Sequence, residues 1–162
     1  MGDRTVAVVT VSDRVSCGTA EDRSGPTAVA LLESAGLRVV ECRVIPDGVE
    51  SVAGTLSELA GTVDLIVTTG GTGLTSRDLT PEGTRAVLKR EAPGLAEAMR
   101  AATFGKNPHG MLSRGVAGTI GRTLVVNLPG SVSGVEESLE VILPALSHGL
   151  ELLVSGSSDH NA

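Results

Sequence analysis

The chain has 162 residues, a length that suits one domain, and its apolar and charged fractions are those of a globular protein rather than a disordered one. Its 13 Lys and Arg residues are outnumbered by 19 Asp and Glu residues, and one Phe is the only aromatic residue. Nucleic-acid binding depends on positive charge and on aromatic platforms, so we expect no nucleic-acid partner. A soluble nucleotide is compatible with this charge because backbone N–H groups can hold its phosphates.

The cysteines and histidines form no metal-binding pattern. Cys17 and Cys42 are isolated, and we expect both to be small buried thiols in a reducing compartment. His109, His148 and His160 lie far apart in the sequence. No stretch approaches the roughly 20 apolar residues of a membrane span, and no targeting segment is visible. We therefore expect a cytoplasmic protein with no membrane partner.

The first half of the chain alternates short apolar runs with helical patterns. Residues 5–11 are continuous, β-branched and few, which predicts a strand covered on both faces. A helix is predicted over residues 24–36, a strand over residues 37–45 and a second helix over residues 49–61.

The second half continues this alternation. Its predicted elements are a buried strand over residues 63–69, a helix capped by Thr80, a helix that begins at Pro93 and a strand over residues 124–128. Residues 105–121 are expected to be irregular, with a short hairpin. A long apolar helical stretch follows, with a kink or a split expected at Pro144 and a polar tail from Ser155.

Strands that alternate with helices predict a three-layer α/β/α sandwich with a doubly wound, mostly parallel sheet. We expect one domain over residues 1–162, with a core over about residues 5–154 and a polar tail over residues 155–162. Ligands of such sheets bind beyond the carboxyl ends of the strands. Parallel pairing would bring four polar segments to that edge: Ser12-Asp13-Arg14, Pro46-Asp47, the loop from Gly70 to Asp78, and residues 127–131.

The loop over residues 70–73 has the sequence GGTG, which is neither a Walker A motif nor a Rossmann fingerprint. Residues without a Cβ let backbone N–H groups approach an oxyanion, so the loop suits an anion nest. A tight strand-to-helix turn is an equal alternative for one such loop. A second one at Pro129-Gly130 favours a ligand.

Asp47 and Asp78 could together hold Mg²⁺, which commonly binds one or two carboxylates plus substrate phosphates. Structural alternatives are a turn for Asp47-Gly48 and a helix N-terminus for Asp78. Arg14, Arg77 and Arg114 could clamp phosphates or form surface ion pairs.

Several of these motifs resemble the MogA/MoaB family, which is similar to the G domain of gephyrin. The motifs are Ser12-Asp13-Arg14, Ser24-Gly25-Pro26, Pro46-Asp47, the run TTGGTGLTSRDLTPE over residues 68–82, Leu112-Ser113-Arg114 and Asn127-Leu128-Pro129-Gly130-Ser131. The resemblance covers about residues 5–154. It implies an α/β/α fold and a homotrimer, with a hexamer as the alternative, and hand-over of the product to a molybdenum-insertion protein.

The resemblance also implies a molybdopterin adenylyltransferase of molybdenum cofactor synthesis. In that reaction the terminal phosphate of molybdopterin attacks the α-phosphate of Mg-ATP and releases pyrophosphate. The family's two important aspartates fall on Asp47 and Asp78, which would be catalytic and bind Mg²⁺. The positions implied to bind ATP or molybdopterin are Ser12, Asp13, Gly70, Gly71, Thr72, Gly73, Ser113, Arg114, Leu128, Pro129, Gly130 and Ser131.

The chain departs from the family pattern at two places. Val132 and Ser133 stand where many members have Pro and Lys, and Gly48 stands where an acid often follows the Pro-Asp. Two alternatives from other classes are kept: a non-catalytic, MoaB-type scaffold that binds molybdopterin and delivers it to a partner, and a generic nucleotide-binding α/β domain.

Overall fold

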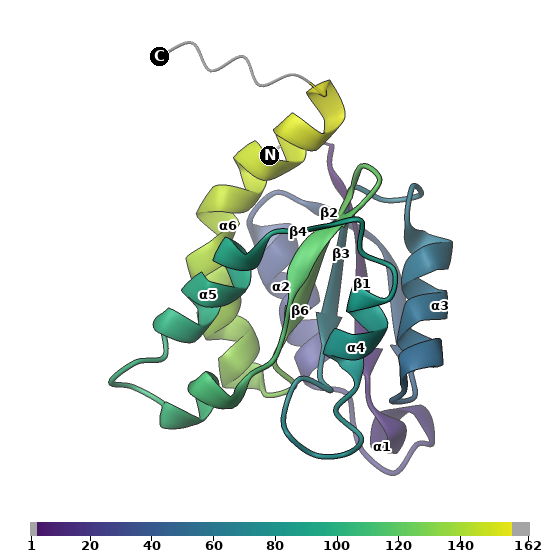
Figure 1. Ribbon diagram of the computed structural model, residues 1–162, viewed down its shortest axis with the longest axis vertical. Helices are drawn as coiled ribbons and strands as arrows, with labels where there is room; N and C mark the ends of the chain where they lie inside the picture. The colour runs from purple at the N-terminus through teal and green to yellow at the C-terminus, as the bar shows by residue number, and fades with distance from the viewer. Residues whose placement is uncertain (1–2, 157–162) are drawn as a thin grey trace.

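A six-stranded sheet lies between two layers of helices in the computed structural model, which describes residues 3–156 (Figure 1). Four strands run parallel to one another: β1 (Thr5–Val11), β2 (Arg38–Ile45), β3 (Leu65–Thr69) and β6 (Thr123–Leu128). The other two are β4 (Arg90–Glu91) and β5 (Ala117–Ile120), and β5 is antiparallel to both its neighbours. The strand order is β2-β1-β3-β6-β5-β4, so the predicted mostly parallel α/β sandwich is confirmed.

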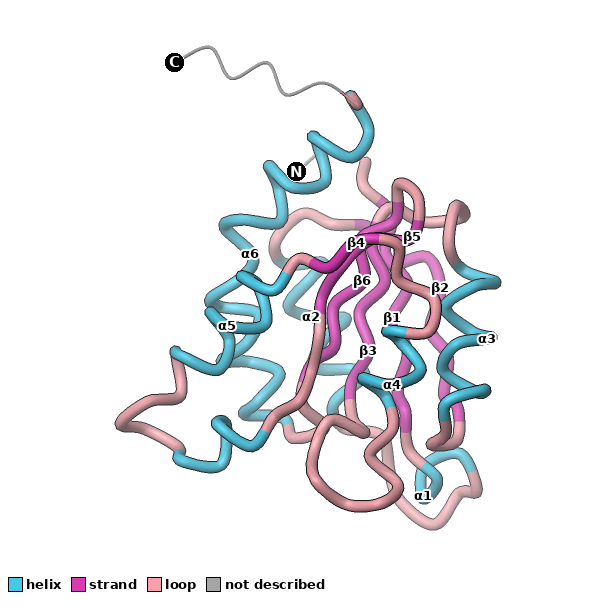
Figure 2. The backbone as a smooth tube through the Cα atoms, in the orientation of Figure 1, coloured by secondary structure: helices cyan, strands magenta, loops and turns pink. Residues whose placement is uncertain are grey.

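The helices divide between the two faces of the sheet (Figure 2). One face carries α2 (Ser24–Ser34), α5 (Pro93–Ala101) and α6 (Val132–Ser155). The other carries α3 (Val49–Leu59) and α4 (Thr80–Arg85). Short α1 (Asp13–Ser16) and the 3-10 helix η1 (Pro108–Leu112) lie in the connections.

Alternation along the buried strands supplies a core to each face. In β1, Val6 and Val8 pack with α2 and α6 on one side, whereas Ala7 and Val9 pack with α3 on the other. Successive side chains of a strand point to opposite faces, so a continuous apolar run is what a doubly covered strand requires. The sequence signature of residues 5–11 therefore has a direct structural cause.

The predicted split of the last helix is wrong, because α6 continues through Pro144 without a break. Its buried face, which includes Leu139 and Leu146, packs in the core with α2 and α5. By length and composition α6 could cross a membrane, but the core helix of a soluble protein passes the same test, so this is weak evidence.

Three further expectations differ from the structure or lie outside it. Cys17 and Cys42 are both exposed rather than buried, since Cys17 follows α1 outside the sheet and Cys42 lies on the exposed face of edge strand β2. The two-residue strand β4 has no counterpart among the predicted elements. The predicted tail falls mostly on residues 157–162, outside the described residues.

The close approach of α3 and α4 gives a test of the fold. A Cβ at Gly83 of α4 would lie 2.7 Å from Val52 Cβ and 2.9 Å from Val49 O, both on α3. We expect Gly83→Ala to lower the free energy of unfolding by about 1–3 kcal/mol in urea denaturation, because overpacking forces the helices apart. The matched variant Gly54→Ala points into open space on α3 and should raise it by about 0.5–1 kcal/mol. Equal stabilisation by both variants would contradict this packing.

Candidate functional site

The carboxyl ends of the four parallel strands place their polar loops at one edge of the sheet, as predicted. The loops contact one another directly: Asp13 N donates to Asp47 Oδ2 at 2.9 Å, and Asp47 N donates to Asp13 Oδ1 at 3.0 Å. Gly70 N donates to Leu128 O at 3.2 Å, and a Cβ at Gly130 would lie 3.1 Å from Gly70 Cα. Segments far apart in the sequence therefore form one continuous surface.

A cavity of about 730 Å³ opens on this surface. Both predicted aspartates, Asp47 and Asp78, line it. Its other predicted members are Ser12, Gly70, Gly71, Gly130 and Ser131. The structure thus brings the two carboxylates and parts of both glycine loops to one polar cavity.

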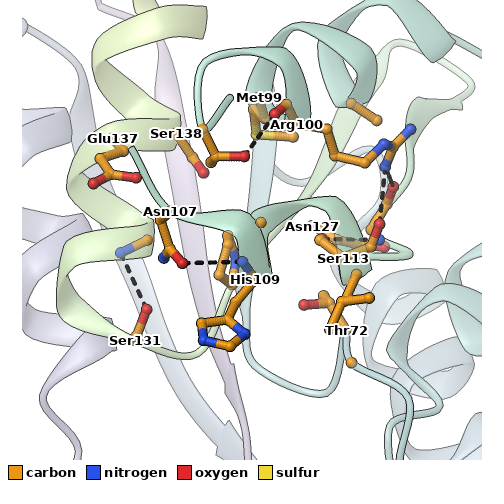
Figure 3. Close-up of a pocket in the computed structure, with 18 residues that line it drawn as sticks. Thr72, Met99, Arg100, Asn107, His109, Ser113, Asn127, Ser131, Glu137 and Ser138 are labelled. Carbon is orange, nitrogen blue, oxygen red and sulfur yellow. Dashed lines mark hydrogen bonds between the residues drawn. The ribbon is translucent and has the colours of Figure 1, made fainter. Parts of the chain in front are cut away.

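A second, smaller cavity of about 180 Å³ is lined by the last two residues of the GGTG loop and is drawn in Figure 3. Among the predicted residues it is lined by Thr72, Gly73, Ser113, Pro129 and Ser131. The first two loop glycines therefore face the larger cavity and the last two loop residues the smaller one. Ser131 lines both cavities, so the two spaces lie on either side of this residue.

The smaller cavity also contains residues that the sequence motifs do not reveal. Arg100 of α5, Asn107 and His109 line it together with Glu137 of α6 (Figure 3). His109 N donates to Asn107 Oδ1 at 3.0 Å, which starts the short helix η1. The sequence feature that could have indicated Asn107 and His109 is the long irregular segment over residues 105–121, because such segments in compact domains are often functional.

The start of α6 lies between the two cavities. Ser131 caps this helix, and its Oγ accepts a hydrogen bond from Gly134 N at 3.1 Å. A helix N-terminus presents unpaired N–H groups and a partial positive charge, so an anion is stabilised there. Val132 and Ser133 form the first turn, and Ser133 lines the larger cavity.

Arg114 holds the loop that carries Asp78. Its backbone N donates to Thr72 O at 2.9 Å and its Nε to Gly73 O at 2.8 Å. The rest of its guanidinium donates to Asp78 O and to both carboxylate oxygens of Glu82. The side chain is thus engaged with the loop and with α4 and lies outside the linings of both cavities.

The Glu82–Arg114 pair is electrostatically coupled. The hydrogen bond from Arg114 lowers the pKa of the Glu82 carboxyl, and the same contact raises the pKa of Arg114. Both groups therefore stay charged over a wider pH range than in isolation. We call Arg114 and Glu82, together with the contacts of Arg114 to Gly73 and Asp78, the Arg114 clamp.

Other predicted residues also act on the loops rather than in a cavity. The Asp13 carboxylate accepts from Asp47 N and pairs with Arg77 at 3.2 Å, so Arg77 forms an ion pair. Leu128 is fully buried and offers its carbonyl to Gly70. Of the three candidate arginines, Arg14 lines the larger cavity.

The predicted N-cap at Thr80 is wrong. Leu79 occupies the cap position of α4 without a side-chain cap bond, and Thr80 lies within the first turn. Asp78 Oδ2 instead accepts from Thr75 N at 2.8 Å, which stabilises the turn before the helix. Gly48, which replaces the family's acid, has φ of +137°, a conformation that side chains rarely adopt.

The donor chemistry of the larger cavity limits the metal that it could hold. Across residues 3–156, no group of three or more His, Cys, Asp or Glu side chains could hold a metal ion. Asp47 and Asp78 supply hard oxygen donors only, which suits Mg²⁺ bound jointly with substrate phosphates and does not suit a closed zinc site.

Comparisons with known proteins agree with this geometry. Residues 7–148 match the family model described as a probable molybdopterin binding domain. Over 153 residues the chain is 35% identical to the molybdopterin adenylyltransferase of Helicobacter pylori, covering 92% of this chain and 87% of that one. It is 41% identical to gephyrin of Dictyostelium discoideum over 93% of this chain, but spans only 22% of that longer protein.

A solved structure has the same fold. The molybdopterin biosynthesis enzyme MoaB of Thermus thermophilus superposes with a TM-score of 0.89 at 44% identity. The match covers 94% of this chain and 97% of that one.

The Arg114 clamp predicts a pH-dependent contribution to stability. Because the pKa of the Glu82 carboxyl is lowered in the folded protein, Glu82 stabilises the fold above its ordinary pKa of 4.5. This contribution disappears as the pH falls through the pKa of Glu82 in the folded state. We expect Glu82→Gln to lower the free energy of unfolding at neutral pH by up to about 1 kcal/mol, since the pair is partly exposed.

Urea unfolding at neutral pH and at about pH 3.5 checks this expectation, and the difference between Glu82→Gln and the unchanged protein should shrink at the lower pH. Glu151→Gln, on an exposed position of α6, removes the same charge and serves as the control. A difference that does not change with pH would show that the clamp adds no charge-dependent stability.

Proposed function

The chain belongs to the family of probable molybdopterin binding domains, and on that premise we propose that it adenylylates molybdopterin in molybdenum cofactor biosynthesis. The substrates are molybdopterin and ATP with Mg²⁺, and the products are adenylyl-molybdopterin and pyrophosphate. The molybdopterin adenylyltransferase of Helicobacter pylori, of which this chain covers 87%, supports this assignment.

One structural observation carries the proposal: two cavities adjoin at Ser131, which lines both, and the larger one contains both aspartates. A transfer between two substrates requires two adjoining binding spaces, so that the reacting groups of the two substrates come together. The meeting point lies at the N-terminus of α6 and beside the GGTG loop, where backbone N–H groups stabilise phosphate oxygens. The geometry therefore suits a reaction between two phosphate-bearing molecules.

The residues of the site position and neutralise phosphates rather than attack them. The terminal phosphate of molybdopterin is itself the nucleophile, so no catalytic Ser or Cys is needed. Phosphoryl-transfer sites work mainly by positioning and by electrostatic stabilisation, which the glycine loops and the start of α6 provide. Asp47 and Asp78 would hold Mg²⁺, which when bound neutralises charge on the triphosphate.

We also propose that the protein is cytoplasmic. It forms a homotrimer that hands its product to a molybdenum-insertion protein. An apolar groove of about 690 Å³ between α5, the end of α6 and the β5–β6 hairpin, with Leu95, Leu152 and Leu153 in its lining, supports association between copies. Sedimentation equilibrium measures the mass of the assembly, and a monomer at micromolar concentration would contradict the trimer.

Asp78→Asn tests the catalytic assignment. The amide keeps an oxygen for the hydrogen bond from Thr75 N but removes the charge that Mg²⁺ needs. We expect pyrophosphate release from molybdopterin and Mg-ATP to fall about 100-fold or more, with the fold unchanged by circular dichroism. Glu151→Gln, at the end of α6 away from the site edge, removes an equal charge and should keep full activity.

The unchanged protein distinguishes the alternatives. Pyrophosphate release establishes the transferase. Tight molybdopterin binding without an ATP-dependent product would instead establish the scaffold, and ATP binding without affinity for molybdopterin would establish a generic nucleotide-binding domain.

A further inference from the structure

Thr80 carries a buried hydroxyl group that lacks a partner. The residue is 0% exposed, and Oγ1 of Thr80 has no hydrogen-bond partner, alone among the buried side-chain polar atoms in the described part of the chain. Burial of an unpaired polar group costs stability, so native proteins rarely retain one without a reason. An exception of this kind beside a binding site suggests that the partner arrives with the ligand.

The neighbouring threonine and asparagine side chains are hydrogen-bonded, which makes the exception local. Thr84 Oγ1 donates to Thr80 O at 2.7 Å, and Asn127 Nδ2 donates to Thr84 Oγ1 and to Thr68 Oγ1, each at 3.0 Å. These bonds connect α4 to β3 and β6 and hold the Thr80 backbone in place. The unpaired hydroxyl therefore lies in a well-ordered network rather than in a loosely packed region.

The hydroxyl points toward Gly71 and Asp47. A Cβ at Gly71 would lie 2.2 Å from Thr80 Oγ1 and 3.1 Å from Asp47 Oδ1, so both oxygens lie on the same side of this glycine. Thr80 N donates to Gly71 O at 3.1 Å, which fixes the helix against the loop. A side chain at Gly71 would collide with the Thr80 hydroxyl and lie close to Asp47 Oδ1, so its absence leaves room beside both oxygens.

The two oxygens of Asp47 have different surroundings. Oδ2 accepts a hydrogen bond from Asp13 N at 2.9 Å, whereas Oδ1 lies beside Gly71, on the side where the Thr80 hydroxyl also lies. A carboxylate that binds a cation needs its orientation fixed by hydrogen bonds from behind, and loss of such a partner typically lowers metal affinity 10–100-fold. The Asp13 backbone supplies one such bond, and a second donor is needed to hold the other oxygen.

We propose that Thr80 is a positioning residue for Asp47, and that its hydroxyl donates to Asp47 Oδ1 when the cation and the nucleotide bind. Each carboxylate oxygen can accept more than one interaction, so Asp47 can take both hydrogen bonds and still face the cation. The cost of the unpaired hydroxyl in the free protein is then recovered on binding, which favours the loaded state. This inference rests on the proposed cation site at Asp47 and Asp78.

Thr80→Val separates this role from simple space filling, because valine has the same shape and lacks the hydroxyl. We expect its thermal midpoint to equal or exceed that of the unchanged protein, since an unpaired polar group is removed. We expect its affinity for Mn²⁺ in the presence of ATP, measured by electron paramagnetic resonance, to fall about tenfold or more. Thr80→Ser keeps the hydroxyl and should bind Mn²⁺ within about twofold of the unchanged protein.

Thr123→Val is the matched control, since Thr123 is also 0% exposed but its hydroxyl is paired. It donates to Val63 O at 2.7 Å and accepts from Gly61 N at 2.9 Å, at the opposite end of the sheet. This variant should lose thermal stability and keep its Mn²⁺ affinity. Thr80→Ala repeats the Mn²⁺ comparison with a smaller side chain, should Thr80→Val fold poorly.

Three results would overturn the inference. Unchanged Mn²⁺ affinity in both Thr80→Val and Thr80→Ala would show that the hydroxyl has no role in binding. Equal weakening by Thr80→Val and Thr123→Val would show a general loss of order. Absence of Mn²⁺ binding by the unchanged protein would instead remove the proposed cation site itself, and with it the role of Thr80.

Discussion

The parallel pairing of β2, β1, β3 and β6 is the constraint on which the rest of the structure depends. These strands end together, so the residues that follow them must share one edge of the sheet. The two hydrogen bonds between Asp13 and Asp47 are possible only because β1 pairs with β2 up to Val11 and Ile45. A slip of one residue in any strand would reverse its buried faces and separate the loops.

Close backbone approach at that edge explains part of the high glycine content. A Cβ at Gly70 would lie 2.4 Å from Val11 O, and its φ of +91° is one that other residues rarely adopt. Gly130 meets Gly70 from the adjacent strand, and Gly71 leaves room beside Thr80 and Asp47. Glycine here allows three loops to touch, and the same absence of side chains exposes N–H groups to a phosphate. Packing and anion binding thus impose the same residue type.

The sequence was sufficient to predict those features that local patterns determine. Strand β1 follows from an apolar run, and the positions of Asp47 and Asp78 at one edge follow from parallel pairing together with the family motifs. Contacts between distant side chains left no such pattern. The sequence left open whether Arg114 clamps a phosphate or forms an ion pair, and only the structure shows that Gly73, Asp78 and Glu82 engage its guanidinium. Motif similarity identifies a position as part of a site without saying whether its side chain faces the ligand or supports the loop behind it.

The same limit applies to Thr80 and to the smaller cavity. A threonine before Pro81 is typical of an N-cap. The structure instead shows that α4 begins at Thr80 itself, one residue earlier than this pattern predicts, and that the Thr80 hydroxyl is buried. The lining residues Arg100, Asn107 and His109 come from a segment without periodicity, so no pattern could place them. Tertiary contacts, rather than local propensity, decide these positions.

A net charge of −6 raises the question of how the protein attracts anionic substrates. The answer lies in the distribution of charge along the site edge. The start of the long helix α6 directs its partial positive charge between the two cavities, and the lining of the larger one mixes Arg14 and Arg23 with the acidic residues Glu21, Asp22 and Glu136. Several carboxylates nearby are already neutralised by partners, as Glu82 is by Arg114 and Asp13 by Arg77. Asp47 and Asp78 differ from these because neither forms an ion pair with an Arg or Lys side chain within the described residues. Under the proposed function, their charge is available to a cation that arrives with the triphosphate, and the acidic character of the chain is then part of substrate recognition rather than an obstacle to it.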